Sequence, residues 1–207
     1  MLKTLIAVSR RCSCLLALQL LWLSGFAHAG AAEQLAAHLQ NVNNLKAGFV
    51  QVVRDDRGEV LEESRGSMTF KRPDKLRWEV AEPYRYQIIT DGETLWRYDP
   101  DFEELITEPF EQVSQTPIMI LAASAEQLSG DYHVKLVAGS ELQRFSLKPH
   151  KANADFSELE LSFRNDLLTA MILHDKLGQT TRIDLNQVVV NSDAVVDSLF
   201  VFEQDKP

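Results

Sequence analysis

The sequence predicts a mainly β protein with few helices, in which many short strands form a largely antiparallel sheet. Three observations lead to this fold class. Apolar and polar residues alternate through most of the chain, short turn signals separate the alternating segments, and one early segment has clear helical spacing. Because strands joined by short turns pair antiparallel, the segments are expected to follow one another in a meander.

The helical segment precedes the strands. Residues 33–45, EQLAAHLQNVNNL, place Leu35, Leu39, Val42 and Leu45 near helical spacing, whereas Glu, His, Gln and Asn occupy the opposite face. This pattern predicts one amphipathic helix. After this segment the apolar period changes to two.

The strands are predicted from alternation and are bounded by turn signals. Asp91-Gly92 is a strong two-residue hairpin signal, and Asn165-Asp166 marks another turn. The strands expected from this pattern are residues 49–53, 59–71, 76–80, 86–90, 94–98, 132–137, 142–147, 156–163, 168–173 and 180–190, with short additional strands at 105–107 and 200–202.

One apolar segment interrupts the strands. Residues 116–124 are TPIMILAAS, in which Thr116 can cap a helix and Pro117 suits its first position. The helix expected at 118–123 is apolar on all sides, too short to span a membrane and too hydrophobic for a solvated surface, so it must be buried. A further turn of helix is expected at 193–198.

The N-terminus has the three parts of a secretory signal peptide. Lys3, Arg10 and Arg11 form a basic region, residues 15–23 form an uncharged apolar run, and a small-residue site ends at Ala29. The run is too short to span a bilayer as a helix, and no stop-transfer flank follows it, which argues against a retained membrane anchor. We therefore expect residues 1–29 to be removed on export, which for a bacterial signal leads to the periplasm.

The mature chain, residues 30–207, is expected to form a single domain. Both cysteines, Cys12 and Cys14, lie in the signal segment, so the mature protein has neither a disulfide nor a lipidated cysteine. Without the signal the chain has 18 basic and 30 acidic residues, a net charge of −12. Such an acidic chain is a poor partner for nucleic acid or anionic membranes and is expected to stay monomeric.

Sequence signatures of enzymes are absent. The chain has no G-x-S-x-G, H-E-x-x-H, P-loop or G-x-G-x-x-G motif. The histidines of the mature chain are scattered without ligand spacing, so we expect no metal site; they are His38, His133, His150 and His174. Two carboxylates that meet only in space, as in glycosidases, stay compatible with the sequence.

One strand carries an unexpected charge. In GSMTFKRPDKLRWEV, the stretch from residue 66 to 80, Gly66, Met68, Phe70 and Arg72 share one face. An arginine on the inner face needs acceptors because an unpaired buried charge is costly. The alternative is that the following proline ends the strand and the arginine turns out to solvent at the rim.

Few predicted elements can pack on the apolar inner face of this sheet, because the predicted helices are few and short. Two arrangements are compatible with the pattern. The sheet can close around its own side chains as an ordinary core, or it can stay partly open with the helices as a lid over an apolar cavity.

Several motifs, in their order along the chain, resemble a known family. The chain resembles the periplasmic outer-membrane lipoprotein carrier family, LolA, in the order of five motifs, which are LKAGFVQ, GSMTFKRPDKLRWEV, ITDGETLWRYDP, QTPIMILAAS and VDSLFVFE. The resemblance covers essentially the whole mature chain, and Lys71-Arg72-Pro73 is among its most specific parts. It implies a strongly curved antiparallel sheet that forms an incomplete β-barrel, covered by a lid of short α-helices.

The resemblance also implies a function. Members of the family are soluble periplasmic chaperones and not enzymes. They accept lipoproteins released from the inner membrane by an ABC transporter, shield the acyl chains in an apolar cavity, and deliver them to an outer-membrane receptor. The expected partners are therefore the lipoproteins, the transporter and the receptor, and no cofactor is expected.

The candidate site residues follow from the same resemblance. The arginine of the Lys-Arg-Pro motif, here Arg72, is implied to latch the lid by hydrogen bonds to backbone carbonyls near Leu39, Ile120 and Leu121. Leu76 falls at an aromatic position that the family uses to contact its transporter and cargo. The acyl-chain cavity is expected to be lined by Phe49, Met68, Phe70, Trp78, Ile118 and Met119.

Three other functions are possible for a chain of this kind, and each requires its own sequence or structural feature. A lipid- or lipoprotein-binding sensor of the same fold would usually have a second domain, for which this chain has no room. The outer-membrane receptor would need a lipidated cysteine after the apolar run. A periplasmic enzyme would need two ionisable groups that converge in the cavity.

Overall fold

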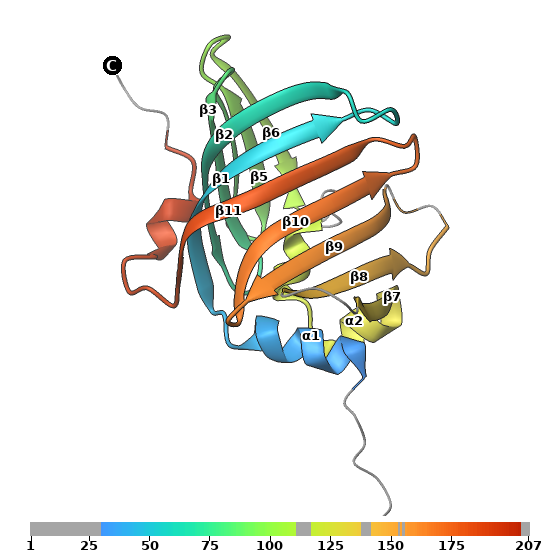
Figure 1. Ribbon diagram of the computed structural model, residues 1–207. Helices are drawn as coiled ribbons and strands as arrows, with labels where there is room; N and C mark the ends of the chain where they lie inside the picture. Colours follow the sequence, from blue (N-terminus) through green and yellow to red (C-terminus); the bar gives the residue numbers. More distant parts are fainter. Residues whose placement is uncertain (1–29, 111–116, 138–141, 153, 155, 204–207) are drawn as a thin grey trace, which may run out of the picture. The chain divides into compact units, whose positions relative to one another are not determined.

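The computed structural model describes residues 30–110, 117–137, 142–152, 154 and 156–203. The predicted signal segment, residues 1–29, and Thr116 lie outside these residues. Residues Ala31–Pro207 form one compact unit, most of which is a single curved sheet (Figure 1).

The sheet has eleven strands. They are β1 (Asn44–Arg54), β2 (Val60–Lys71), β3 (Lys75–Glu82), β4 (Tyr86–Thr90), β5 (Thr94–Asp99), β6 (Glu104–Pro109), β7 (Tyr132–Val137), β8 (Gln143–Pro149), β9 (Phe156–Arg164), β10 (Leu167–Asp175) and β11 (Thr180–Val190). All neighbours pair antiparallel, in the order β6-β5-β4-β3-β2-β1-β11-β10-β9-β8-β7. Within the described residues β6 and β7 do not pair with each other, so the barrel is incomplete, as predicted.

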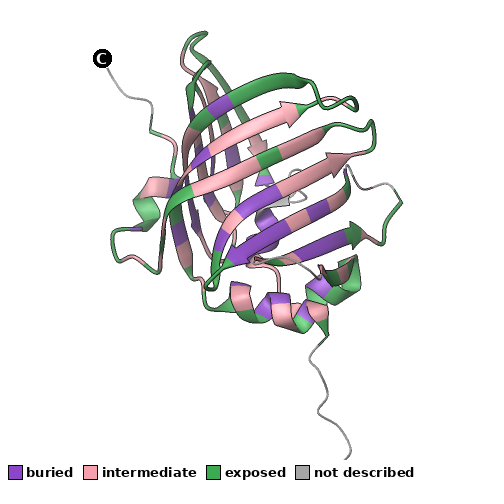
Figure 2. Cartoon of the chain, in the orientation of Figure 1, coloured by how far each residue is buried: buried purple, intermediate pink, exposed green. Residues whose placement is uncertain are grey.

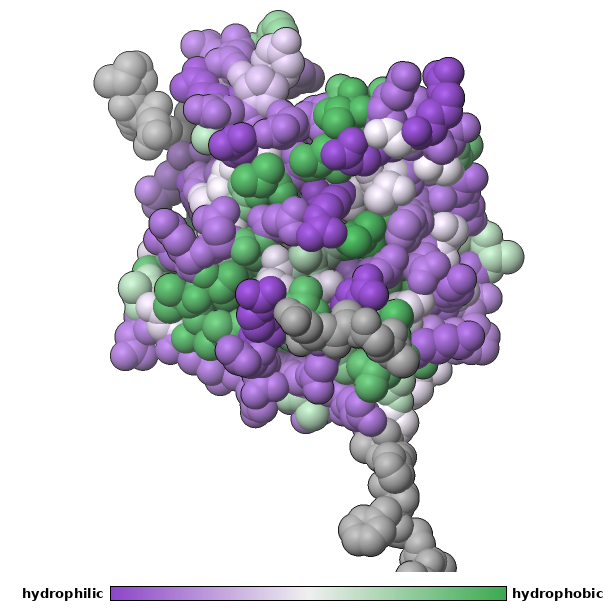
Figure 3. Space-filling view, viewed as in Figure 1, coloured by the Kyte–Doolittle hydropathy of each residue, from purple (hydrophilic) through white to green (hydrophobic). Residues whose placement is uncertain are grey.

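Alternation along each strand separates an inner from an outer face. On β1 and β2, Leu45 lies opposite Phe70 and Ala47 lies opposite Met68, and all four are buried. Figure 2 shows buried residues on the sheet interleaved with exposed ones. The outer surface in the view of Figure 3 is mostly hydrophilic with scattered hydrophobic side chains, which is normal for a sheet that packs on one face.

Local chemistry fixes the turns. Asn165 and Asp166 have φ of 49° and 64° and form the predicted two-residue turn between β9 and β10, since Asn and Asp tolerate this backbone region. Between β4 and β5, the Asp91 side chain accepts a hydrogen bond from the Thr94 N–H at 2.8 Å, and Gly92 has φ of 97°. This connection spans residues 91–93 and is longer than the predicted two-residue turn.

The first helix, α1 (Ala31–Gln40), ends earlier than predicted. Its buried face contains Leu35 and Leu39, but Leu45 belongs to β1. The cause is a contact distant in sequence: the Asn191 side chain at the end of β11 accepts from the Asn43 N–H at 2.8 Å and donates to the Asn41 carbonyl at 2.7 Å. These bonds turn the chain into β1 before another helical turn can form.

The predicted apolar helix is a 3-10 helix, η2 (Pro117–Ala122), and an unpredicted helix, α2 (Ala125–Asp131), follows it. Ser124 caps α2 in a capping box: the Gln127 N–H donates to the Ser124 hydroxyl at 3.3 Å, and the Ser124 N–H donates to the Gln127 side chain at 2.7 Å. The Ser-x-x-Gln spacing is a helix-start signal that the sequence does contain. Helix α2 packs on α1 and β7 (Figure 1).

The C-terminal segment does not add a strand. The strand predicted at 200–202 and the helical turn predicted at 193–198 are both replaced by a 3-10 helix, η3 (Asp197–Phe200), which contacts β3. Asp197 forms ion pairs with Lys71 at 2.7 Å and Lys75 at 3.2 Å, and Phe200 is fully buried. These contacts hold the segment against the sheet, where no free strand edge is available for pairing.

Candidate functional site

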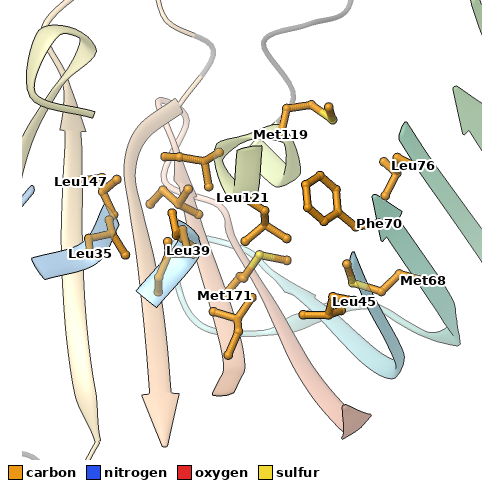
Figure 4. Close-up of a cluster of buried hydrophobic side chains, with 14 of the residues drawn as sticks. Leu35, Leu39, Leu45, Met68, Phe70, Leu76, Met119, Leu121, Leu147 and Met171 are labelled. Carbon is orange, nitrogen blue, oxygen red and sulfur yellow. The ribbon is translucent and has the colours of Figure 1, made fainter. Parts of the chain in front are cut away.

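The helices α1, η2 and α2 together form what we call the lid. The apolar segment η2 is buried as predicted, because Met119, Ile120 and Leu121 are only 9, 6 and 3% exposed. Figure 4 shows Leu121 of η2 between Leu39 of α1 and Phe70 of β2. The lid therefore shares one hydrophobic core with the sheet.

Arg72, the residue after β2, connects the sheet to two parts of the lid. Its Nε donates to the Val42 carbonyl at 2.9 Å and its Nη2 to the Leu39 carbonyl at 2.9 Å, at the end of α1. Nη2 also donates to the Leu121 carbonyl at 2.7 Å, and Nη1 donates to the Ala122 carbonyl at 2.6 Å, at the end of η2. Among the described residues, four of the five guanidinium N–H groups are thus bonded to backbone oxygens.

The electrostatics of this arrangement favour an arginine. The last carbonyls of a helix lack partners within the helix and carry partial negative charge, so they accept readily from a cation. Within the described part of the chain, no carboxylate forms an ion pair with Arg72, and burial lowers the pKa of its guanidinium below its ordinary value. The positive charge is therefore balanced by oriented carbonyl dipoles.

The expected acceptors are only partly those observed. The Leu39 and Leu121 carbonyls bind Arg72, but the Ile120 carbonyl accepts instead from the Ala123 N–H at 3.0 Å. Because a tight 3-10 turn uses the Ile120 oxygen internally, the next two carbonyls, of Leu121 and Ala122, are the free ones. Ala122 was missed because this choice depends on the type of helix, and Val42 was missed because it lies beyond the point at which α1 ends.

A second contact fastens α1 to the sheet. The His38 ring stacks on Phe163 of β9 with ring centroids 4.8 Å apart, and its Nδ1 lies 3.1 Å from an Asp166 carboxylate oxygen in the β9–β10 turn. His38, one of the histidines without ligand spacing, thus packs between the lid and the sheet.

An apolar cavity of about 410 Å³ lies inside the barrel beside η2. Its walls come from both halves of the sheet and from the lid. The lining residues are Gln51, Leu76, Trp78, Tyr86, Ile88, Thr90, Leu95, Arg97, Phe110, Met119, Leu159, Met171, Leu173, Thr181 and Ile183. A cavity of this size and character is typical of a small-molecule or lipid site.

The predicted cavity residues divide into two groups. Trp78 and Met119 line the cavity. Phe49, Met68 and Phe70 do not line it, because they are at most 2% exposed and fill the core between the cavity and the lid. The Ile118 side chain lies outside the described residues.

The predicted transporter-contact residue, Leu76, lies in the cavity wall. It is only 5% exposed, so it faces the interior and not the protein surface. Phe49 stacks on Trp78 with ring centroids 3.9 Å apart, which joins the core group to the cavity wall.

The described residues contain no cluster of three or more His, Cys, Asp or Glu side chains suited to a metal ion. No described helix is long and apolar enough to cross a membrane.

Comparison with known proteins gives a consistent picture. The family model described as "Outer membrane lipoprotein carrier protein LolA" matches residues 40–203. A protein of Chromohalobacter salexigens named outer-membrane lipoprotein carrier protein is 37% identical over 182 residues, covering 87% of this chain and 86% of the relative. A protein of the same name from Hahella chejuensis is 34% identical, covering 87% of each chain.

Solved structures resemble the fold at low sequence identity. A protein from Thermus thermophilus superposes with a TM-score of 0.55 at 12% identity, covering 84% of this chain and 96% of that chain. The structure of MucB superposes with a TM-score of 0.52 at 15% identity, covering 83% of this chain and 62% of that chain. These two comparisons concern the fold alone.

Proposed function

This chain belongs to the outer membrane lipoprotein carrier protein family, LolA, and from this membership we propose that it is a soluble periplasmic chaperone for lipoproteins. In this proposal the acyl chains of the cargo occupy the cavity beneath the lid. The cargo comes from an ABC transporter of the inner membrane and passes to a receptor at the outer membrane. The protein acts as a monomer, catalyses no reaction and uses no cofactor.

The observation that carries the proposal is an apolar cavity beside a lid in which the ends of α1 and η2 are both bonded to Arg72. Each buried methylene contributes ~0.8 kcal/mol, so an acyl chain of about fifteen methylenes is held in a membrane by ~12 kcal/mol. A carrier therefore needs an apolar site of comparable strength and a way to release its cargo. The four bonds of Arg72 supply a reversible closure because they can be replaced by bonds to water when the lid opens.

The size of the cavity supports an opening lid. A cavity of about 410 Å³ lies near the lower end of the range of about 300–1,000 Å³ that is typical of small-molecule sites. A cargo with two or three chains needs more room. If η2 moves away from Arg72, the cavity extends toward Phe49, Met68 and Phe70, which then become part of the acyl-chain site.

The same movement gives Leu76 its proposed role. In the closed state it is buried in the cavity wall, where it can contact an acyl chain. Contact with the transporter requires the open state, in which the cavity wall is accessible.

The decisive experiment measures release of cargo from membranes. The protein is expressed from its full sequence, purified from periplasmic extract and added to spheroplasts that synthesise labelled lipoproteins. Labelled lipoproteins are expected in the soluble fraction, bound to the protein, and a known carrier serves as the positive control. No release while the known carrier works would refute the proposal.

The same preparation tests the localisation. Mass spectrometry of the purified protein is expected to find a chain that begins at Gly30. A protein that stays in the cell pellet with its N-terminal segment intact would contradict the expected export.

A further inference from the structure

Three polar side chains lie together on the inner face of the central strands. Gln51 of β1 is paired with Ser64 of β2 on one side and with Ile183 of β11 on the other. Thr181 is two residues from Ile183 on β11 and so points to the same face. We call Gln51, Ser64 and Thr181 the polar wall.

The side chains of the polar wall have no hydrogen-bond partners in the part of the chain that the structure describes. Among the described residues, none of its three side chains forms a hydrogen bond. Ser64 is only 1% exposed, and its hydroxyl oxygen is buried without a partner. Gln51 and Thr181 line the cavity. Gln51 and Thr181 are half-buried, so their amide and hydroxyl groups can bind a ligand in the cavity. The buried Ser64 hydroxyl beside them is the kind of unpaired group that is rare and costly in a folded protein.

The polar wall lies at one end of the cavity. Along β1 the inner residues change from Leu45 and Phe49 on the lid side to Gln51 on the side of the β1–β2 hairpin. The lid end includes Leu76 and Met119, and the Thr90 hydroxyl there already accepts a hydrogen bond from the Gly92 N–H at 3.0 Å. The cavity is therefore suited to a molecule with an apolar tail and a polar head.

The chemistry of the wall selects a neutral head. Its amide and two hydroxyls donate hydrogen bonds but carry no charge. The cation of the cavity, Arg97, is already paired with Glu108 at 3.1 Å. Carbonyl oxygens are the neutral acceptors that match uncommitted N–H and O–H donors.

We propose that Gln51 and Thr181, the two residues of the polar wall that line the cavity, bind the ester carbonyl oxygens of the cargo, where its acyl chains join the glyceryl group, with the chains directed toward η2. This inference rests on the proposed function and adds an orientation and a recognised chemical group to it. It assigns to these residues a positioning role at the head of the lipid.

The test compares two synthetic probes with the intact protein. One is a lipopeptide with two ester-linked palmitoyl chains on a glycerylcysteine, and the other has the same chains joined through ethers, which lack the carbonyl oxygens. Binding is measured by displacement of a fluorescent fatty acid. The variant is Gln51→Leu, and the matched control is Gln87→Leu, because Gln87 alternates with the cavity residues Tyr86 and Ile88 and so lies on the outer face of β4.

The proposal predicts opposite results for the two probes. Gln51→Leu is expected to weaken binding of the ester probe roughly 3- to 10-fold, the range for one hydrogen bond, and to leave the ether probe unchanged or bound more tightly. Thr181→Val should act in the same direction, which guards against one variant that fails to fold, and thermal unfolding checks each protein. Gln87→Leu should change neither probe.

Each other outcome is informative. If Gln51→Leu binds both probes as well as or better than the unchanged protein, the cavity is simply apolar and the inference is wrong, while the carrier function stands. If the unchanged protein binds neither probe, the proposed function fails and the inference fails with it.

Discussion

Replacing Arg72 by leucine is expected to release the lid while the sheet stays folded. Arg72 lies outside the hydrogen-bonded ladder of β2, and its side chain contacts the ends of α1 and η2 through backbone carbonyls only. Leucine keeps the apolar stem but removes all four bonds. The closed lid then contains carbonyl oxygens without donors, whereas an open lid exposes them to water.

The size of the effect follows from the bonds that are lost. A hydrogen bond from a charged donor contributes roughly 1.5–3 kcal/mol. Four bonds to one partly exposed guanidinium do not add fully, so the equivalent of two bonds, ~3–6 kcal/mol, is a reasonable range. Since about 1.4 kcal/mol changes an equilibrium tenfold, the ratio of closed to open lid should fall by roughly 10²- to 10⁴-fold.

Amide hydrogen exchange measures this ratio directly. The Ala123 N–H, bonded to the Ile120 carbonyl at 3.0 Å, reports on η2 and should exchange faster by up to the same factor. Amides between β1 and β2 should not change. The matched control is Arg65→Leu, an exposed residue of the same strand whose ion pair with Glu63 at 2.8 Å should contribute ~1 kcal/mol or less.

Cargo transfer is the functional readout. The leucine variant should still bind lipid but fail to close on its cargo or release it normally in the spheroplast assay. The latch is wrong if the variant shows the exchange rates of the unchanged protein in η2 and also transfers cargo at the normal rate. Arg72→Lys should fall between the two, because an ammonium group cannot reach four separated carbonyls.

Three further predictions concern the sheet and the C-terminal segment. Gly66→Ala should destabilise the protein by at least ~1–3 kcal/mol in urea unfolding, because the new Cβ would overlap a carbonyl oxygen of β3. The control is Gly130→Ala, whose new Cβ meets open space. Equal stability of the two variants would contradict the close packing at Gly66. Phe200→Ala should cost ~3–5 kcal/mol, since this ring is fully buried, and a loss below about 1 kcal/mol would mean that the C-terminal segment is not anchored there. Hydrogen bonds from Lys71 and, to a smaller extent, from Lys75 lower the pKa of the Asp197 carboxyl below 3.8. The ion pairs of Asp197 therefore stabilise the protein above pH 3.8, and this contribution is lost as the pH falls through the lowered pKa. Asp197→Asn should abolish this acid-dependent loss of stability, and an NMR titration that gives Asp197 a pKa at or above 3.8 would contradict the prediction.

Local patterns in the sequence predicted most of the sheet. A strand is recognised from alternation over a few residues, and the turn at Asn165-Asp166 is recognised from residue types that tolerate positive φ. Errors appear where a distant contact decides. The Asn191 side chain binds the backbone N–H of Asn43, and α1 therefore ends before Leu45. The ion pairs of Asp197 hold η3 against the sheet at the place where the sequence predicts a strand at 200–202.

Periodicity along the chain was enough to predict the buried apolar segment and the inner face of each strand. For Arg72 the pattern allowed both an inward and a rim position, and the family resemblance favoured the inward one. Which carbonyls bind Arg72 and which residues surround the cavity depend on the tertiary structure. Phe70 and Trp78 look alike in the sequence, yet one fills the core and the other lines the cavity. The difference arises from how far the sheet curves and where the lid rests on it, and neither is encoded within a few neighbouring residues.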